Sequence, residues 1–451
     1  MTPKPDPQSQ PHTAHLFAPL LVDLLDNSHE LFILAGKIDW TWIDSELSSS
    51  YAKIGRAGIP SRMMAGLHLL KHAKGLSDEE VCRQWRENPY FQYFCGEEYF
   101  QHRFPIERSS MTHWRKRIGD KKLERLISEL LRVAVDSKAL ELESLQKVIV
   151  DTTVQPKNVT HPTDGKLALR ALTELCKLAK KHDIKLRQTY AKEAKTLAIK
   201  AGRYAHAKQY KRMRKSLKQL KGRLGRVERD ILRKIKGNEE LEDVFAKPLY
   251  KAFLIRTQKP RDKEKVYSWH APEVECIGKG KAHRPYEFGL KVSVTTPLKR
   301  SAGGLFVLHS EAIAGRPFDG HTLNRVIENG TKLTGVKPKR IYADKGYKGH
   351  GYPEKRVVFL SGQKRGVTEE IKKELNRRSA VEPVIGHMKT DGHLGRNFLL
   401  GADGDKINAV LCGAGHNMRL LLKWFATLLL QFWESVLTEK RKPEQVAQAF
   451  A

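Results

Sequence analysis

The sequence predicts a mixed α/β protein with one sheet, a helical region before the sheet and a basic helical insertion within it. The short β-branched run at 148–150 is typical of a buried strand, and another short strand is predicted at 340–343. Around them lie stretches in which apolar residues recur every three or four positions, as in amphipathic helices. The alternation of the two periods indicates one mixed sheet flanked by helices.

Residues 16–146 are expected to be helical throughout. Ser77 is a plausible N-cap, and Glu80 three residues later completes a capping box. A short helix capped by Ser109 or Ser110 is expected to expose basic side chains, namely His113, Arg115, Lys116 and Arg117. Two short helices with a turn resemble a helix-turn-helix, which predicts DNA binding; a solvated basic helix is the alternative.

The run Val148, Ile149 and Val150 predicts a short buried strand that delivers Asp151 at its end. Further strands are expected at 265–271, 286–296, 304–313, 340–343 and 356–360, and helices at 319–333 and 368–389. Asp319 is expected to be the N-cap of its helix. Asp344 directly follows the strand at 340–343.

The net charge predicts a polyanionic partner. Lys and Arg number 82 against 51 Asp and Glu, which gives +31 and a pI near 9.8. Such an excess favours nucleic acid. A membrane surface is disfavoured, because no N-terminal apolar segment exists and ionisable residues interrupt the apolar stretch at 407–433. Five scattered Cys without CxxC spacing indicate reduced thiols in a cytosol and no zinc finger.

The insertion at 166–246 concentrates this charge. Residues 166–236 contain 24 Lys and Arg against 5 Asp and Glu, or +19 of the total. Leu and Ile residues from Leu217 to Ile231 form a coiled-coil-like seam, and Gly202 is a possible break between two arms. We expect an exposed two-helix hairpin that binds DNA through Arg212, Arg214, Lys215 and Lys218; a dimerisation arm is the alternative.

Three acids form the candidate catalytic set: Asp151, Asp344 and Glu382. Residues at the carboxyl ends of strands meet in a crevice, and three carboxylates there repel one another unless a cation neutralises them. Oxygen ligands without a Cys/His cluster indicate Mg²⁺ or Mn²⁺, and two such ions are the usual device for displacement at a phosphodiester. The alternative is that each Asp merely anchors a turn.

The stretch "RRSAVEPVIGHMK" places Arg378, Glu382, Ile385 and Lys389 on one helical face. A salt-bridged surface helix explains that spacing equally well.

Three blocks, "VIVDTTV", "IYADKGYKG" and "RRSAVEPVIGHMK" with the residues that follow, resemble the DDE transposases of bacterial insertion sequences, of the insertion-sequence-five type. "IPSRMMAGLHLLKHAKGLSDEEVCRQWRENPYFQYFCG" is similar to their N-terminal helical domain, so the resemblance runs from about 59 to 424 apart from the insertion. It implies an RNase H-like fold in which Asp151, Asp344 and Glu382 are metal ligands. The third block matches the family's Arg and Lys at Arg378 and Lys389, whereas the family's Tyr falls at Leu375.

The resemblance implies a transposase that binds the inverted repeats at element ends and catalyses Mg²⁺-dependent cleavage and strand transfer. Arg378, Lys389 and Lys345 would contact double-stranded DNA. A homodimer or higher multimer on the nucleoid in the bacterial cytoplasm is expected. A catalytically silent DNA-binding relative and a metal-dependent nuclease of the same fold are the alternatives. The expected organisation is a disordered tail (1–15), a helical DNA-binding domain (16–146), a catalytic domain (147–430) interrupted by the hairpin (166–246), and a C-terminal tail (431–451).

Overall fold

The computed structural model describes residues 18–51, 58–259, 262, 265–278 and 285–448, with side chains up to residue 431. The expected tail at 1–15 lies outside these residues. The chain divides into two compact units, one formed by the residues up to Pro156 and from Leu290 onward, the other by Lys157–Gly289. No helix within the described ranges combines the length and apolarity needed to cross a membrane.

Among the described residues, the first unit begins with seven α-helices: α1 (Leu21–Leu24), α2 (Glu30–Lys37), α3 (Trp40–Ser48), α4 (Ser61–Lys74), α5 (Asp78–Glu87), α6 (Pro89–Phe94) and α7 (Ser109–Asp136). The predicted N-cap of α5 is confirmed, since the Ser77 side chain accepts a hydrogen bond from the Glu80 N–H at 3.0 Å. The Glu80 carboxylate pairs with Arg83. α7 is interrupted at Gly119, whose φ of +74° is not helical, so the short helix predicted after Ser109 ends there and a second helix continues to Asp136.

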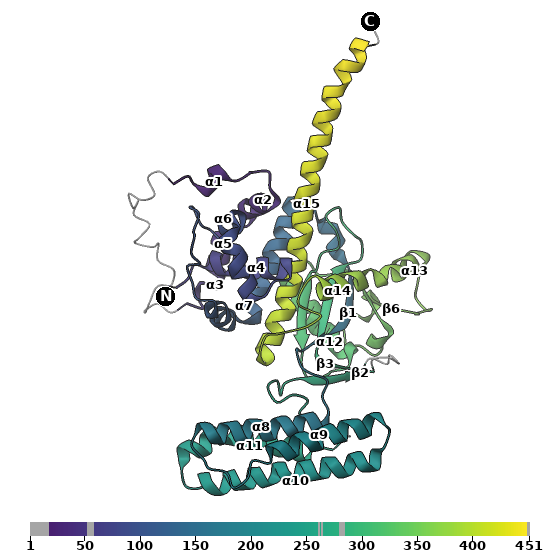
Figure 1. Ribbon diagram of the computed structural model, residues 1–451. Helices are drawn as coiled ribbons and strands as arrows, with labels where there is room; N and C mark the ends of the chain where they lie inside the picture. The colour runs from purple at the N-terminus through teal and green to yellow at the C-terminus, as the bar shows by residue number, and fades with distance from the viewer. Residues whose placement is uncertain (1–17, 52–57, 260–261, 263–264, 279–284, 449–451) are drawn as a thin grey trace. The chain divides into compact units, whose positions relative to one another are not determined.

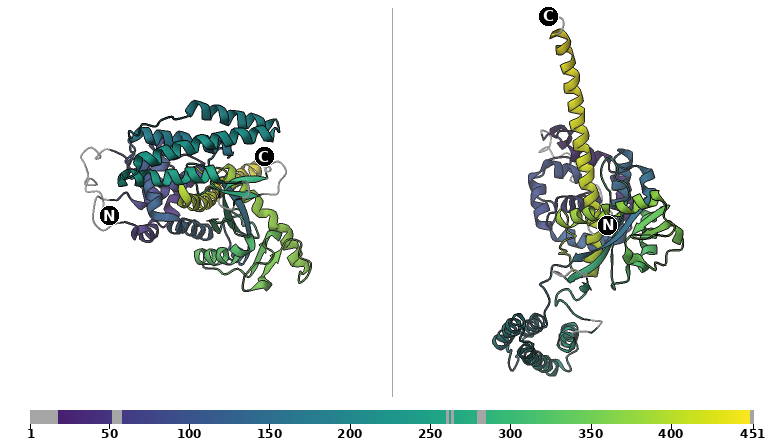
Figure 2. Two further views of the ribbon diagram at one scale, coloured as in Figure 1. Left: turned by 90° about the horizontal axis from the view of Figure 1, so that it is seen from below. Right: turned by 90° about the vertical axis from the view of Figure 1, so that its right-hand side faces the viewer.

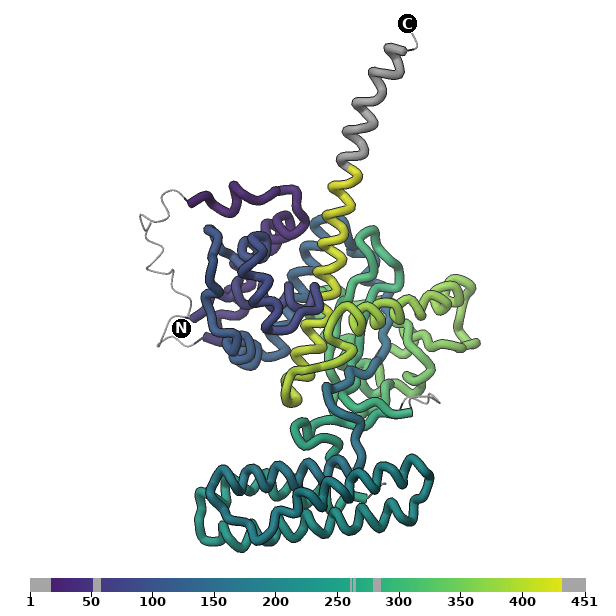
Figure 3. The backbone as a smooth tube through the Cα atoms, viewed as in Figure 1, coloured from purple at the N-terminus to yellow at the C-terminus, as the bar shows by residue number. Residues whose placement is uncertain are grey.

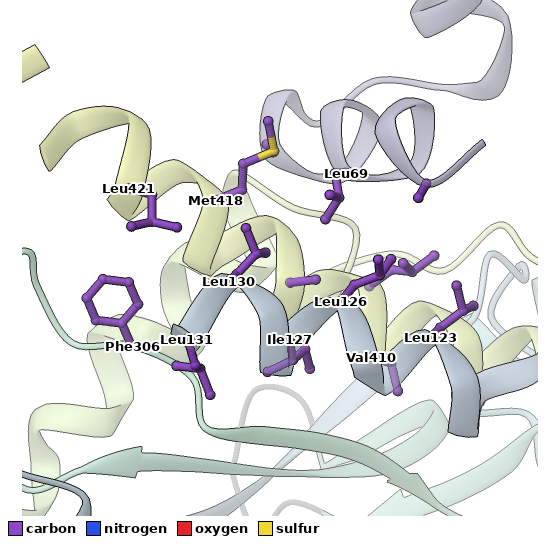
Figure 4. Close-up of a cluster of buried hydrophobic side chains, with 14 of the residues drawn as sticks. Leu69, Leu123, Leu126, Ile127, Leu130, Leu131, Phe306, Val410, Met418 and Leu421 are labelled. Carbon is purple, nitrogen blue, oxygen red and sulfur yellow. The ribbon is translucent and has the colours of Figure 1, made fainter. Parts of the chain in front are cut away.

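The core of this unit lies where α7 packs against the long C-terminal helix α15 (Gly401–Gln448). Leu126, Leu130 and Ile127 of α7 meet Val410 and Met418 of α15, and all five are almost fully buried (Figure 4). A helix therefore extends over 431–448, where a C-terminal tail was predicted.

The described residues form one six-stranded mixed sheet (Figure 1). Its strands are β1 (Lys147–Pro156), β2 (Glu275–Gly278), β3 (Tyr286–Pro297), β4 (His309–Ile313), β5 (Arg340–Ala343) and β6 (Val358–Leu360). The order is β2-β3-β1-β5-β6, with β4 also paired to β3. β1 and β5 are parallel, as are β5 and β6, whereas β4 and β2 are antiparallel to β3.

Two strand predictions need correction. The described residues 265–271 form no strand. The short strand β2 follows them and begins at Glu275. The predicted strand at 304–313 begins only at His309, because Ser301–Gly304 forms a separate bridge and the pairing of β3 with β4 covers only Lys291–Thr295, with Thr295 opposite His309. Local composition alone does not reveal which part of such a run finds a partner strand.

Helices and turns join the strands: η3 (Leu142–Gln146), α12 (Asp319–Thr334), η4 (Lys345–Tyr347), η5 (Lys355–Val357), α13 (Glu369–Asn376), η6 (Arg377–Ala380) and α14 (Val381–Thr390). The single helix predicted at 368–389 is thus three segments, two α-helices with a 3₁₀ turn between them.

The second unit is a four-helix bundle of α8 (Asp164–Lys181), α9 (Ala191–His206), α10 (Tyr210–Ile235) and α11 (Glu239–Thr257). Figures 1 and 3 show the helices side by side, and the right view of Figure 2 looks along them. The predicted two-helix hairpin was wrong. Gly202 lies inside α9 rather than at a break, and the buried seam of α10 contacts α8, α9 and α11 instead of one partner helix.

Candidate active site

Asp151 and Asp344 are neighbours across two parallel strands. The last register pair of β1 and β5 joins Val150 to Ala343, and each Asp is the next residue along its strand. Because paired strands lie about 4.8 Å apart, the two backbones bring these carboxylates side by side at the end of β5. The Asp344 side chain also accepts a hydrogen bond from the Lys345 N–H at 2.6 Å, which caps η4.

The prediction that Asp151 ends its strand was wrong, because β1 continues to Pro156. Only the pairing with β5 ends beside Asp151; β1 goes on along the twelve-residue β3. Ile149 belongs to the buried cluster that includes Val381 of α14. Since side chains two positions apart share a strand face, Asp151 projects on the face that α14 covers.

Glu382 reaches this edge from α14. Val381, Val384 and Met388 recur at helical spacing and are buried in the same cluster as Ile149, so they fix α14 on the sheet. Glu382 stands beside that stripe with its side chain 64% exposed. The helix is thereby held by its apolar face while its acid stays open to solvent.

A second anchor holds the preceding helix α13. Glu374 is buried at the start of the strands, where its carboxylate lies 2.6 Å from Lys147 Nζ on β1 and 2.8 Å from an Arg340 guanidinium nitrogen on β5. Tyr342 also donates a hydrogen bond to Glu374. These contacts fix the segment that leads into Arg378 and Glu382.

Arg378 joins two of the three acids. One nitrogen of its guanidinium lies 3.3 Å from Asp151 Oδ2, and another lies 3.7 Å from Glu382 Oε1. Burial raises the pKa of Asp151; the Thr152 N–H and Arg378 lower it, and Asp344 and Glu382 raise it again, so that the net shift is upward. The three carboxylates therefore share one electrostatic environment.

The ligand atoms of these three acids are not gathered within 4.8 Å of one another. The single group of three that meets this condition, within the described part of the chain, is Glu124, His309 and Glu311. The carboxylates repel one another, and Arg378 lies between Asp151 and Glu382. These two effects account for the wider spacing.

Asp319 is a fourth acid near this edge. It was predicted to cap α12, but the N-cap position is Phe318. The Asp319 carboxylate instead accepts hydrogen bonds from Thr152 Oγ1 at 3.1 Å and from Lys291 Nζ at 2.8 Å. In the sequence, the signal for a position like that of Asp319 is an acid between a strand and a helix. The same pattern also predicts a helix N-cap, which was the prediction made for Asp319.

Tyr347 lies among the same acids. Burial raises the pKa of its phenol well above the ordinary value, and the charges of Asp319, Asp151 and Asp344 raise it further. Gly320 allows the start of α12 to lie close to the backbone of Tyr347, because a Cβ at position 320 would lie 3.1 Å from the Tyr347 carbonyl oxygen.

The predicted DNA-contacting cations fall into two groups. Lys345, Lys116 and Arg117 are exposed, and Lys389 is half-buried on α14. The prediction that Arg115 is exposed was wrong. Its side chain is buried and lies 2.8 Å from the Asp78 carboxylate, because residue 115 falls on the inner face of α7. It stabilises the helical region rather than offering a charge at the surface.

The remaining positions lie as follows. The four cations of α10 are all exposed: Arg212, Arg214, Lys215 and Lys218. Leu375, at the position of the family's Tyr, packs against the apolar cluster under α14. His387 pairs with Asp391, with 2.7 Å between Nδ1 and Oδ2.

Comparison with known proteins finds a family match in the helical N-terminal region. Residues 20–117 match the family model described as Transposase domain (DUF772). An uncharacterized protein, ORF8 in the nfe locus of Rhizobium meliloti, is 49% identical over 195 residues, which are 43% of this chain and 94% of that protein. No solved structure matches the chain. The chain therefore belongs to the family of the Rhizobium meliloti ORF8 protein, and its helical N-terminal region matches a transposase domain.

Proposed function

We propose that the chain is a DDE transposase of the insertion-sequence-five type, which binds the ends of a mobile element and cuts and joins DNA strands with Mg²⁺. The observation that carries this proposal is the meeting of Asp151 and Asp344 on neighbouring parallel strands, with Arg378 joining Asp151 to Glu382 of the covering helix. The match of residues 20–117 to a transposase domain supports it from a separate part of the chain.

The strand order supports an RNase H-like catalytic domain. β1 lies in the middle, β3 and β4 follow on one side, and the parallel strands β5 and β6 lie on the other. β3 runs against β1, since the Leu298 N–H donates to the Lys147 carbonyl at the far end of the pair. A first strand flanked by an antiparallel pair and a parallel pair is the arrangement of that fold.

The donor set fits Mg²⁺ or Mn²⁺. Asp151, Asp344 and Glu382 offer carboxylate oxygens only, which are the ligands these hard cations prefer. Burial is the main cause of the raised pKa of Asp151, and the charges of Asp344 and Glu382 raise this pKa further. Two ions held there would activate an attacking oxygen and stabilise the leaving oxygen of an in-line displacement.

The chain's own cations would position the DNA strand. Arg378 is only 15% exposed and is fixed by Asp151, so it presents a rigid guanidinium beside the reacting phosphate. Lys345 directly follows Asp344, and Lys389 lies on the same helix as Glu382. Such contacts hold the backbone without reading base sequence. Because cleavage and strand transfer are both in-line displacements at phosphorus, one site serves both steps.

The remaining basic surface would hold the DNA. Residues 166–236 carry a net charge of +19, and Lys116 and Arg117 are exposed on α7. Since a transposase must hold two element ends together, we propose a dimer or higher multimer on DNA, acting in the bacterial cytoplasm.

The test is a strand-cleavage assay on duplexes that carry the genomic flanks of the gene. Asp151→Asn, Asp344→Asn and Glu382→Gln should each abolish cleavage in Mg²⁺ and leave DNA affinity unchanged or tighter, because each removes a charge that repels phosphate. Ca²⁺ should support binding but little cleavage. A variant that keeps wild-type cleavage removes that residue from the site.

Product analysis separates the alternatives. Joining of the cut 3′ end to a plasmid target supports transposition, whereas nicks without joined products indicate a nuclease of the same fold. Binding without cleavage in either Mg²⁺ or Mn²⁺ indicates a catalytically silent relative.

A further inference from the structure

A second cluster of ligand-type side chains lies away from the three acids, between α7 and β4. Glu124 of α7 and His309 and Glu311 of β4 bring one ligand atom each within 4.8 Å of one another. The side chains of His309, Glu311 and Glu124 are 0%, 5% and 8% exposed. His309 and Glu311 share a strand face because they are two positions apart, whereas Ser310 between them donates to the Ala409 carbonyl of α15.

The imidazole of His309 is an unsatisfied group. Neither ring nitrogen has a hydrogen-bond partner among the described residues, although the ring is fully buried. Leaving a buried polar group without a partner is costly, so such a group calls for an explanation. Burial, together with the charges of Lys121 and Arg325, lowers the pKa of His309 to about 3. The ring is therefore neutral at physiological pH, and neutral imidazole is the form that ligates metals.

The two glutamates are charged neighbours of that ring. Glu311 Oε2 lies 3.7 Å from His309 Nε2. Two ligands of a tetrahedral ion at bond lengths of about 2.1 Å are about 3.4 Å apart, so this separation already matches a shared ion. Asn329 Nδ2 donates a hydrogen bond to the same oxygen, Glu311 Oε2, at 2.8 Å and so helps to orient the carboxylate.

Two cations neutralise the glutamates, but both come from the solvent side. Lys121 Nζ lies 2.9 Å from Glu124, and Arg325 Nε lies 3.1 Å from Glu311. Their side chains are 58% and 60% exposed. Long side chains with that exposure can turn outward into water at little cost, which leaves the two carboxylates and the imidazole to face one another.

We propose that Glu124, His309 and Glu311 bind one divalent transition-metal ion of the zinc class, which ties helix α7 to strand β4. One imidazole nitrogen with two carboxylate oxygens suits Zn²⁺ and Co²⁺, whereas Mg²⁺ prefers oxygen alone. Because α7 belongs to the helical region and β4 to the sheet, the ion joins the two parts of the first unit. This site is independent of the proposed transposase chemistry and uses none of its residues.

The experiment is metal titration of the full-length chain in the Asp151→Asn, Asp344→Asn background, which weakens metal binding at the other set of acids. Zn²⁺ is followed by calorimetry, and Co²⁺ by the visible absorption bands of the bound ion. One equivalent of either ion should bind. Asn329→Ala should weaken binding about 10- to 100-fold, since it removes only the group that orients Glu311. His309→Gln should abolish the Co²⁺ bands.

A second pair of variants keeps the test decisive if changes in the core impair folding. Lys121→Met and Arg325→Met alter exposed side chains and remove the competing cations, so both should tighten Zn²⁺ binding. Failure of the parent and of these two variants to bind Zn²⁺ or Co²⁺ overturns the proposal, and so does binding that is unchanged in His309→Gln. The cluster is then an ion-pair network around a neutral histidine.

Discussion

Replacing four cations of the bundle should change how DNA binding depends on salt. Arg212, Arg214, Lys215 and Lys218 are exposed on α10, and none of them forms an ion pair with a carboxylate within the described part of the chain. By contrast, Arg223 on the same helix lies 2.8 Å from Glu193 and is already compensated. The four uncompensated cations are therefore the ones on α10 that we expect to meet phosphates.

The magnitude follows from counterion release. Each phosphate contact contributes about −0.9 to the slope of log affinity against log salt, so losing four contacts should flatten the slope by up to about 3.6. Between about 50 mM and about 200 mM salt, that difference corresponds to roughly 100-fold in relative affinity. Folding should be unaffected, because the core of the bundle is formed by buried residues such as Leu220 and Leu224 of the same helix.

The assay is fluorescence anisotropy of a labelled duplex with the full-length chain across a salt series. The test variant changes all four residues to Gln. Its matched control exchanges Lys and Arg at the same four positions, which keeps the charge and should keep the slope. A slope that stays unchanged in the Gln variant, together with smaller particles in light scattering, would refute the reasoning and favour a dimerisation role for the bundle.

Three further outcomes are expected. Asp78→Asn should destabilise the helical region by about 3–5 kcal/mol in urea denaturation, because it leaves the buried cations Lys71 and Arg115 without their counterion; a loss below about 1 kcal/mol contradicts this. Lys389→Ala should slow cleavage about 30- to 150-fold, or ~2–3 kcal/mol, with little change in DNA affinity; equal losses in both make Lys389 an ordinary backbone contact. Asp151→Asn should raise the melting temperature at neutral pH in EDTA, since burial makes the ionised carboxylate unfavourable and its pKa is raised from 3.8. That gain should fade as the pH falls through the raised pKa toward 3.8, where the acid is protonated in both states.

Local pattern predicted the parts of the fold that depend on near neighbours. The short strand predicted at 340–343 is present and is followed by Asp344, and Ser77 caps α5. These features are decided by residues within a turn or two, so the sequence displays them directly.

Features that depend on distant partners were missed. Arg115 is basic and adjacent in sequence to two exposed cations, but its side chain is buried in an ion pair with Asp78 of another helix. Asp319 is a residue type that commonly caps helices, but its carboxylate instead accepts hydrogen bonds from Thr152 and Lys291 of two strands. The insertion has one visible seam on α10, whereas three other helices cover it. No periodicity within a segment records which distant segment it meets.

The central claim is that Asp151, Asp344 and Glu382 hold the catalytic metal together, and iron-mediated cleavage of the protein tests it most directly. Fe²⁺ takes the place of Mg²⁺, and ascorbate with peroxide then generates radicals that cut the backbone beside the bound ion. We predict cuts next to residues 151, 344 and 382 that excess Mg²⁺ suppresses and that Asp151→Asn greatly reduces. Absence of cuts at these three places, with or without cuts near Glu124 and His309, would contradict the account.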